Sequence, residues 1–66
     1  MANDITQHLS PAQLAEREGV PLETVYSWQK NRRGPVFMKI GRHVRYRLAD
    51  VLEWEQSRTV ASGRTA

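Results

Sequence analysis

The sequence contains no cysteine. This absence excludes disulfide bonds, thiolate metal sites and cysteine nucleophiles, and with them the small secreted domains that disulfides stabilise. A reducing compartment is the default for such a chain, so we expect a cytoplasmic protein. The two histidines, His8 and His43, are far apart in the sequence and have no zinc-ligand spacing. We therefore expect no metal and no cofactor.

Long apolar runs and enzyme motifs are also missing. The first seven residues contain neither the basic nor the apolar segment of a signal peptide, and no stretch approaches the roughly 18 apolar residues of a membrane span. A chain of 66 residues forms one small domain, which buries only about 60% of its unfolded surface. A catalytic cleft walled off from water is not expected, so we predict no enzyme, no catalytic residue and no membrane contact.

Acidic residues are absent from the middle of the chain. The net charge is only +3, yet residues 30–47 contain seven basic residues and no acid, while both flanking segments are net negative. Such a block is either a solvated basic linker or a surface for a polyanion. Interleaved apolar residues indicate a folded segment and favour the second interpretation. The seven basic residues are Lys30, Arg32, Arg33, Lys39, Arg42, Arg45 and Arg47.

A first helix is predicted over residues 11–18. Ser10 is suited to the N-cap, Pro11 to the first helical position, and Gln13 to the return bond of a capping box. Gly19 supplies a left-handed residue that ends the helix.

A second helix is predicted over residues 21–30, after a tight turn. Val20 and Pro21 offer it no side-chain N-cap. Two short helices joined by a turn containing glycine make a helix-turn-helix unit. At helical spacing the inner face contains Leu22, Val25, Trp28 and Gln29, and the outer face is polar.

After Pro35 the apolar period changes from helical to alternating, which predicts a two-stranded hairpin. A two-residue loop would place Val44 opposite Lys39 and mix apolar with basic side chains. A three-residue loop would instead pair Ile40 with Val44 and Met38 with Tyr46. We predict the three-residue loop, which leaves an outward face that contains Lys39, Arg42, Arg45 and Arg47.

A third helix is predicted over residues 48–55, without a good N-cap and with Leu48, Val51 and Leu52 facing inward. Helical spacing favours packing over base stacking for Trp28 and Trp54. The expected fold is α+β, with a folded domain over residues 8–56, an N-terminal tail over 1–7 and a flexible C-terminal tail over 57–66.

Several segments together carry a family pattern. They are Leu9-Ser10-Pro11, Gly19-Val20-Pro21, Thr24-Val25-Tyr26-Ser27-Trp28, the run from Gly34 to Arg47, and Asp50-Val51-Leu52-Glu53-Trp54. In these segments the chain resembles the excisionase and MerR-like winged helix-turn-helix DNA-binding domains, over about residues 8–56. It looks especially like the small excisionases of temperate phages, such as those of mycobacteriophages.

The resemblance implies that the second helix enters a major groove of double-stranded DNA while the hairpin, as a wing, meets the adjacent minor groove. Residue chemistry then suggests base-edge contacts from Glu23, Thr24, Ser27 and Lys30. Phosphate contacts are expected from Arg32, Arg33, Lys39 and Arg45, and Tyr26 either reaches a phosphate or packs. Arg42 and His43, at the wing tip, are candidates for a narrow minor groove. For each arginine, simple solvation is the alternative.

The resemblance further implies an architectural role. Several copies would bind side by side on DNA repeats and bend the site, so that a phage integrase carries out excision in the bacterial host, with the protein associated with the nucleoid. Because the chain ends about ten residues after the third helix, we expect no effector domain. Without a heptad or unassigned apolar patch we expect a monomer in free solution. A small transcriptional regulator and a protein-interaction module that uses the basic face are the alternatives.

Overall fold

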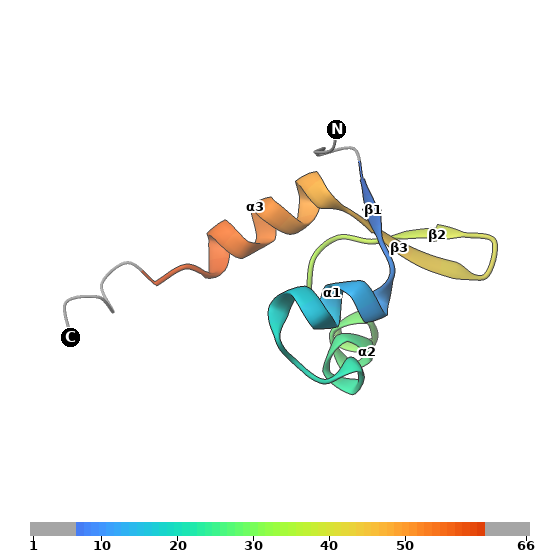
Figure 1. The fold of residues 1–66 in the computed structure, drawn as a ribbon, viewed down its shortest axis with the longest axis horizontal. Coiled ribbons are helices and arrows are strands. Elements are labelled where there is room, and N and C mark those ends of the chain that lie inside the picture. Colours follow the sequence, from blue (N-terminus) through green and yellow to red (C-terminus); the bar gives the residue numbers. More distant parts are fainter. Residues whose placement is uncertain (1–6, 61–66) are drawn as a thin grey trace.

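The two-stranded hairpin and the last helix extend in opposite directions from the middle of the molecule (Figure 1). The computed structural model describes residues 7–60; most of each predicted tail, residues 1–6 and 61–66, lies outside the described residues. The predicted α+β fold, a winged helix-turn-helix, is confirmed. Its elements in chain order are β1 (His8–Leu9), α1 (Pro11–Glu18), α2 (Leu22–Asn31), β2 (Met38–Ile40), β3 (His43–Arg47) and α3 (Leu48–Arg58).

The first helix has the predicted ends. The Ser10 hydroxyl accepts a hydrogen bond from the Gln13 backbone N–H at 3.1 Å, and the Gln13 side chain accepts one from the Ser10 N–H at 2.9 Å. Gly19 ends α1 in the left-handed region, at a φ of 71°. These local contacts satisfy groups that a helix end would otherwise leave unpaired.

The second helix begins and ends one residue later than predicted. Pro21 is its N-cap residue and provides no side-chain hydrogen bond, as expected. Its Val25 is fully buried, and Trp28 and Gln29 are half-buried on the same side. The polar face of α2 is therefore left free beside the hairpin.

A strand that the sequence did not predict completes the sheet. β3 is the central strand, with β1 and β2 on its two sides. β1 pairs antiparallel with β3 and places Leu9 opposite Tyr46. Two residues are too few to show a period of two, so the pattern could not reveal β1.

The predicted hairpin register is wrong. The observed pairs are Met38 with Arg45, Lys39 with Val44, and Ile40 with His43. The loop therefore contains two residues, of which Gly41 has a φ of 65°. Two-residue hairpin loops match the strand twist, and glycine takes the positive φ of the first position without strain. The turn geometry outweighed the match of apolar side chains across the strands.

The buried core draws on nearly every element and is small. It contains Leu9, Leu14, Ala15, Val25, Tyr46 and Val51. Leu22 and Leu52, both predicted to face inward, are 37% and 41% exposed. On α3 the fully buried residue is Val51, and Leu52 lies about 100° further around the helix.

The third helix is longer than predicted and reaches Arg58. Its N-terminus has no side-chain cap, and the Leu48 N–H instead donates to the Gln7 carbonyl at 2.9 Å. The Trp54 ring packs on Trp28, with centroids 5.1 Å apart and an angle of 51° between the rings. Both tryptophans are half-buried, which confirms packing as their role.

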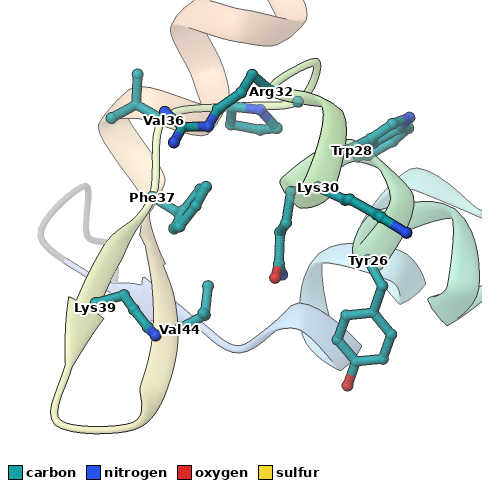
Figure 2. Close-up of a pocket in the computed structure, with 11 residues that line it drawn as sticks. Tyr26, Trp28, Lys30, Arg32, Val36, Phe37, Lys39 and Val44 are labelled. Atoms are coloured by element: carbon teal, nitrogen blue, oxygen red, sulfur yellow. The ribbon is translucent and has the colours of Figure 1, made fainter.

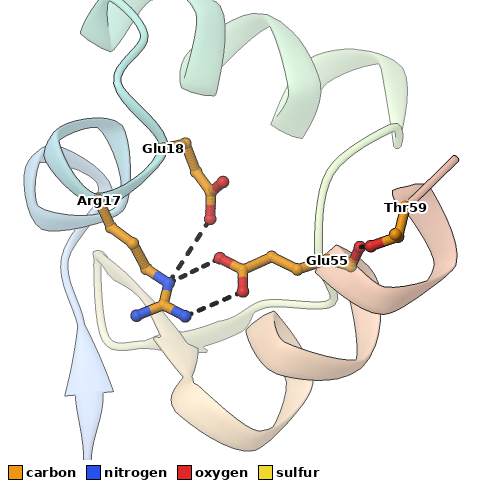
Figure 3. Close-up of polar contacts among 4 residues, drawn as sticks. All are labelled: Arg17, Glu18, Glu55 and Thr59. Atoms are coloured by element: carbon orange, nitrogen blue, oxygen red, sulfur yellow. Dashed lines mark hydrogen bonds and ion pairs between the residues drawn. The ribbon is translucent and has the colours of Figure 1, made fainter. Parts of the chain in front are cut away.

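An ion pair joins α3 to α1 (Figure 3). Arg17 donates to both carboxylate oxygens of Glu55, from Nε at 2.7 Å and from Nη2 at 2.9 Å. Glu18 lies beside this pair, with its Oε2 3.7 Å from Arg17 Nε. The same Glu18 oxygen is buried and has no hydrogen-bond partner among residues 7–60.

The pKa values of Glu18 and Glu55 are shifted in opposite directions by this cluster. Burial, followed by the nearby carboxylate of Glu55, raises the pKa of Glu18 from 4.5 to about 7. The two hydrogen bonds from Arg17, with the Glu18 carboxyl nearby as a smaller cause, lower the pKa of Glu55 from 4.5 to about 2. The protonated form of Glu18 thus favours folding, and the free energy of unfolding falls as the pH rises from about 4.5 to 7. The contribution of Glu55 is complete above its ordinary pKa and is lost as the pH falls toward 2.

Glu18→Gln is expected to stabilise the protein at neutral and alkaline pH, since glutamine cannot ionise beside Glu55. We expect about 1 kcal/mol at pH 8 after allowance for solvent screening, or roughly 4–8 °C in Tm. The measurement is Tm between pH 4.5 and 8, and the variant should lose the decline over that range. Glu16→Gln, with the same charge change at an exposed position of α1, is the control. Parallel pH profiles for wild type and Glu18→Gln would contradict the prediction.

Candidate nucleic-acid interface

A groove of about 770 Å³ lies between α2 and the hairpin (Figure 2). Its apolar walls come mainly from Val36, Phe37 and Val44, and its basic side chains are Lys30, Arg32 and Lys39. No acidic residue lines it within the described part of the chain. The complete lining is Tyr26, Trp28, Gln29, Lys30, Arg32, Gly34, Pro35, Val36, Phe37, Lys39 and Val44. We call this feature the basic groove.

The polar face of α2 adjoins the basic groove. Glu23, Ser27 and Lys30 are exposed and Thr24 is half-buried. The Ser27 hydroxyl accepts a hydrogen bond from the Asn31 side chain at 3.3 Å. Tyr26 is 51% exposed and lines the groove with Lys30, so its ring is free to meet a ligand there.

The turn after α2 has an unusual backbone conformation. Arg32 is its C-cap residue and lies in the left-handed region, with φ of 57° and ψ of 46°. Among the described residues it is the one non-glycine with a positive φ. Such a conformation costs a residue with a side chain about 1–2 kcal/mol and normally favours glycine. Arg32 and Arg33 are both exposed, so the turn presents two adjacent guanidinium groups.

The hairpin register separates the basic residues that the sequence placed on one face. Paired residues in an antiparallel ladder point to the same side, so Lys39 shares a face with Val44, and both line the basic groove. Arg45 shares the opposite face with Met38. There Arg45 is half-buried and donates to the Val44 carbonyl at 2.7 Å.

Arg47 also lies on the face opposite the basic groove and forms an ion pair with Asp50 at 2.9 Å. The prediction that Lys39 shares an outward face with Arg45 and Arg47 is therefore wrong. With a two-residue loop, Lys39 pairs with Val44 and lies on the opposite side of the hairpin from the two arginines. Arg42 and His43 are exposed at the tip, where the sequence placed them.

A partly buried hydrogen bond connects α2 to the central strand. Gln29 Nε2 donates to the Tyr46 hydroxyl at 2.9 Å. Tyr46 is 1% exposed, and its burial raises the pKa of the phenol. The bond links the helix and the wing at the groove. The sequence placed Gln29 on the inner face of α2 but carried no signal for its partner.

The comparisons with known proteins identify the family. A family model described as a helix-turn-helix domain matches residues 9–59. The chain belongs to this helix-turn-helix family. No curated protein and no solved structure matches it significantly.

Family membership makes this a small DNA-binding helix-turn-helix protein, and such families are typically not enzymes. Between residues 7 and 60 no helix is long and apolar enough to cross a membrane. The same residues contain no cluster of three side chains suited to a metal ion.

Arg32→Gly is expected to separate stability from DNA binding in this helix-turn-helix protein. Glycine relieves the left-handed strain, which should raise the free energy of unfolding by up to about 1 kcal/mol. Loss of the guanidinium should weaken DNA binding several-fold and make the salt dependence shallower by about one unit. Chemical denaturation and binding titrations at several salt concentrations measure the two effects. Unchanged DNA affinity would mean that Arg32 occupies its strained position for another reason.

Proposed function

We propose that this protein is an excisionase-like architectural factor, which binds and bends attachment-site DNA so that a phage integrase carries out prophage excision. The observation that carries the DNA-binding part is the basic groove beside the polar face of α2, with three cations and no acid among the described residues that line it. The excisionase part rests on the sequence resemblance over residues 8–56 and on a family that includes excisionase-like proteins.

In the proposed complex, α2 lies in a major groove. Glu23, Thr24, Ser27 and Lys30 contact base edges, where glutamate accepts from cytosine and lysine donates to guanine. Phosphate contacts come from Tyr26, Arg32 and Lys39, which line the basic groove, and from Arg33, which follows Arg32 in the turn. Arg45 would reach a phosphate only from the opposite face of the hairpin.

The wing tip is the proposed source of DNA bending. Arg42 and His43 are exposed at the end of the hairpin, away from the helix-turn-helix unit (Figure 1). Cationic side chains favour a narrow A·T-rich minor groove, and neutralisation of one side of the duplex together with a groove contact favours bending. Further copies on neighbouring DNA repeats would extend the bend, while the free protein is a monomer.

We expect substitutions on α2 and at the wing tip to change different parts of the DNA sequence preference. Glu23→Ala should change the preference among core sequences by about 1 kcal/mol or more per base pair contacted. Arg42→Ala should keep that preference but lose the preference for A·T-rich flanks. Binding selections from a randomised duplex library measure both. If both variants weakened every sequence equally, the division between reading and positioning residues would be wrong.

The deciding experiment is excision in vitro with the cognate integrase and both attachment sites. Excision that depends on the protein, together with a bend in the bound duplex, is the expected result. A discrete DNA complex without stimulation of excision would favour a transcriptional regulator of the same fold. A missing complex at moderate salt would favour a protein-interaction module. If about five phosphates are contacted, log K should fall with log salt with a slope of roughly −4 to −5.

A further inference from the structure

Trp54 connects α3 to the turn that follows α2. Its indole N–H donates to the Arg33 backbone carbonyl at 3.2 Å, and its ring packs on Trp28 of α2. Arg58 lies over the same ring, 5.6 Å from the centroid. Arg58 is also a second, longer donor to the Arg33 carbonyl, at 3.4 Å.

The backbone of this turn is held from two sides. The Arg33 N–H donates to the Trp28 carbonyl at 2.9 Å and the Arg32 N–H to that of Gln29 at 3.4 Å. Gly34 lies so close to Trp28 that a Cβ atom on it would be 3.0 Å from the Trp28 Cβ. The N–H groups of the turn are thus bound to α2 and the Arg33 carbonyl to α3, while both arginine side chains are exposed.

Trp54 itself lies outside the basic groove. It lines a smaller notch of about 260 Å³, whose other residues include Asp50 and Glu53. Carboxylates at that notch would repel phosphates, so DNA is not expected to contact the indole. Any effect of Trp54 on DNA binding must therefore pass through the turn.

We infer that Trp54 is a positioning residue, whose hydrogen bond to the Arg33 carbonyl holds the Arg32–Arg33 turn in the conformation that contacts DNA phosphates. This inference rests on the phosphate contacts proposed above for the two arginines. Arg32 has a left-handed backbone, which is costly for a residue with a side chain, and an external hydrogen bond to the next residue stabilises that conformation. A backbone ordered before binding reduces the entropy lost on binding.

Trp54→Phe tests the inference, because phenylalanine keeps an aromatic ring against Trp28 and removes the N–H donor. We expect DNA affinity to fall about threefold to tenfold and the salt slope to become shallower by up to about one unit, with the sequence preference unchanged. In an R32A/R33A background the same substitution should cause no further loss. Thermal unfolding establishes that the variant is folded.

Two further variants separate positioning from general stability. Glu55→Gln weakens the other attachment of α3, at Arg17, without contact to the turn, and should leave the salt slope unchanged. If Trp54→Phe does not fold, replacement of Trp54 by benzothienylalanine through chemical synthesis keeps the bicyclic shape and exchanges only the N–H for sulfur. It should reproduce the shallower slope.

The outcomes distinguish this inference from the proposed function. Wild-type protein that forms no DNA complex would refute the DNA-binding proposal itself. DNA binding that R32A/R33A weakens, with an unchanged salt slope in the Trp54 variants, would overturn the positioning role alone. Equal losses from Trp54→Phe in the wild-type and R32A/R33A backgrounds would also overturn it, since the effect would then not pass through the arginines.

Discussion

The double variant R32A/K39A is expected to bind DNA about 60-fold more weakly than wild type at 0.1 M salt, because two phosphate contacts contribute about 1.8 units to the salt slope. Both residues line the basic groove, one at the end of α2 and one on β2. Titrations of a labelled duplex between low and high salt measure the affinity and the slope. The slope should become shallower by about 1.8 units.

The hairpin provides a control with the same change in net charge. Arg45 and Arg47 lie on β3 and point to the face opposite the basic groove. R45A/R47A should therefore cost no more than a few-fold in affinity, through the weaker general field of the protein. If the two double variants weaken binding equally, the basic groove is not the DNA-binding surface. A larger loss from R45A/R47A would place the DNA on the other face of the wing.

Leu14→Ala is expected to remove most of the stability of the fold. Leu14 is fully buried in α1, and truncation of a buried leucine costs about 3–5 kcal/mol through lost burial and the cavity left behind. Domains of this size have about 3–10 kcal/mol in total, so the variant should be largely unfolded at 37 °C. Urea denaturation followed by circular dichroism measures the loss.

Leu52→Ala is the matched control, since the same side chain is removed from a position that is 41% exposed. The expected loss is below about 1 kcal/mol, because little apolar surface is re-exposed and alanine favours a helix at least as well as leucine. Equal shifts of the urea midpoint for the two variants would contradict the burial pattern. The pair also tests the sequence pattern, which placed Leu52 on an inner face.

Features that depend on neighbouring residues were predictable. Ser10, Gln13 and Gly19 define α1 through contacts within four residues, and the structure has all of them. The concentration of positive charge in residues 30–47 likewise followed from the sequence, and it identified the segment that forms most of the basic groove.

The hairpin shows where sequence reasoning fails. The apolar match across the strands favoured a three-residue loop, but the conformation of Gly41 favours a two-residue loop. A shift by one residue moves Lys39 to the groove side and leaves Arg45 on the other. An error in one turn therefore changed which cations could act together, although each cation was correctly named as a candidate.

The sequence by itself determined the helix-turn-helix, the hairpin, the third helix and the excess of positive charge, because caps, turns, periodicity and charge are properties of short segments. Only the tertiary structure decided the rest: the pairing of β1 with β3, the faces of the hairpin, the Arg17–Glu55 ion pair and the Trp54 bond to Arg33. The physical reason is that the β1–β3 pairing, the ion pair and the Trp54 bond join residues distant in the chain, while the faces of the hairpin depend on a backbone turn that the apolar pattern does not encode. The geometry of the distant contacts is set by how the elements pack around a core of six buried side chains.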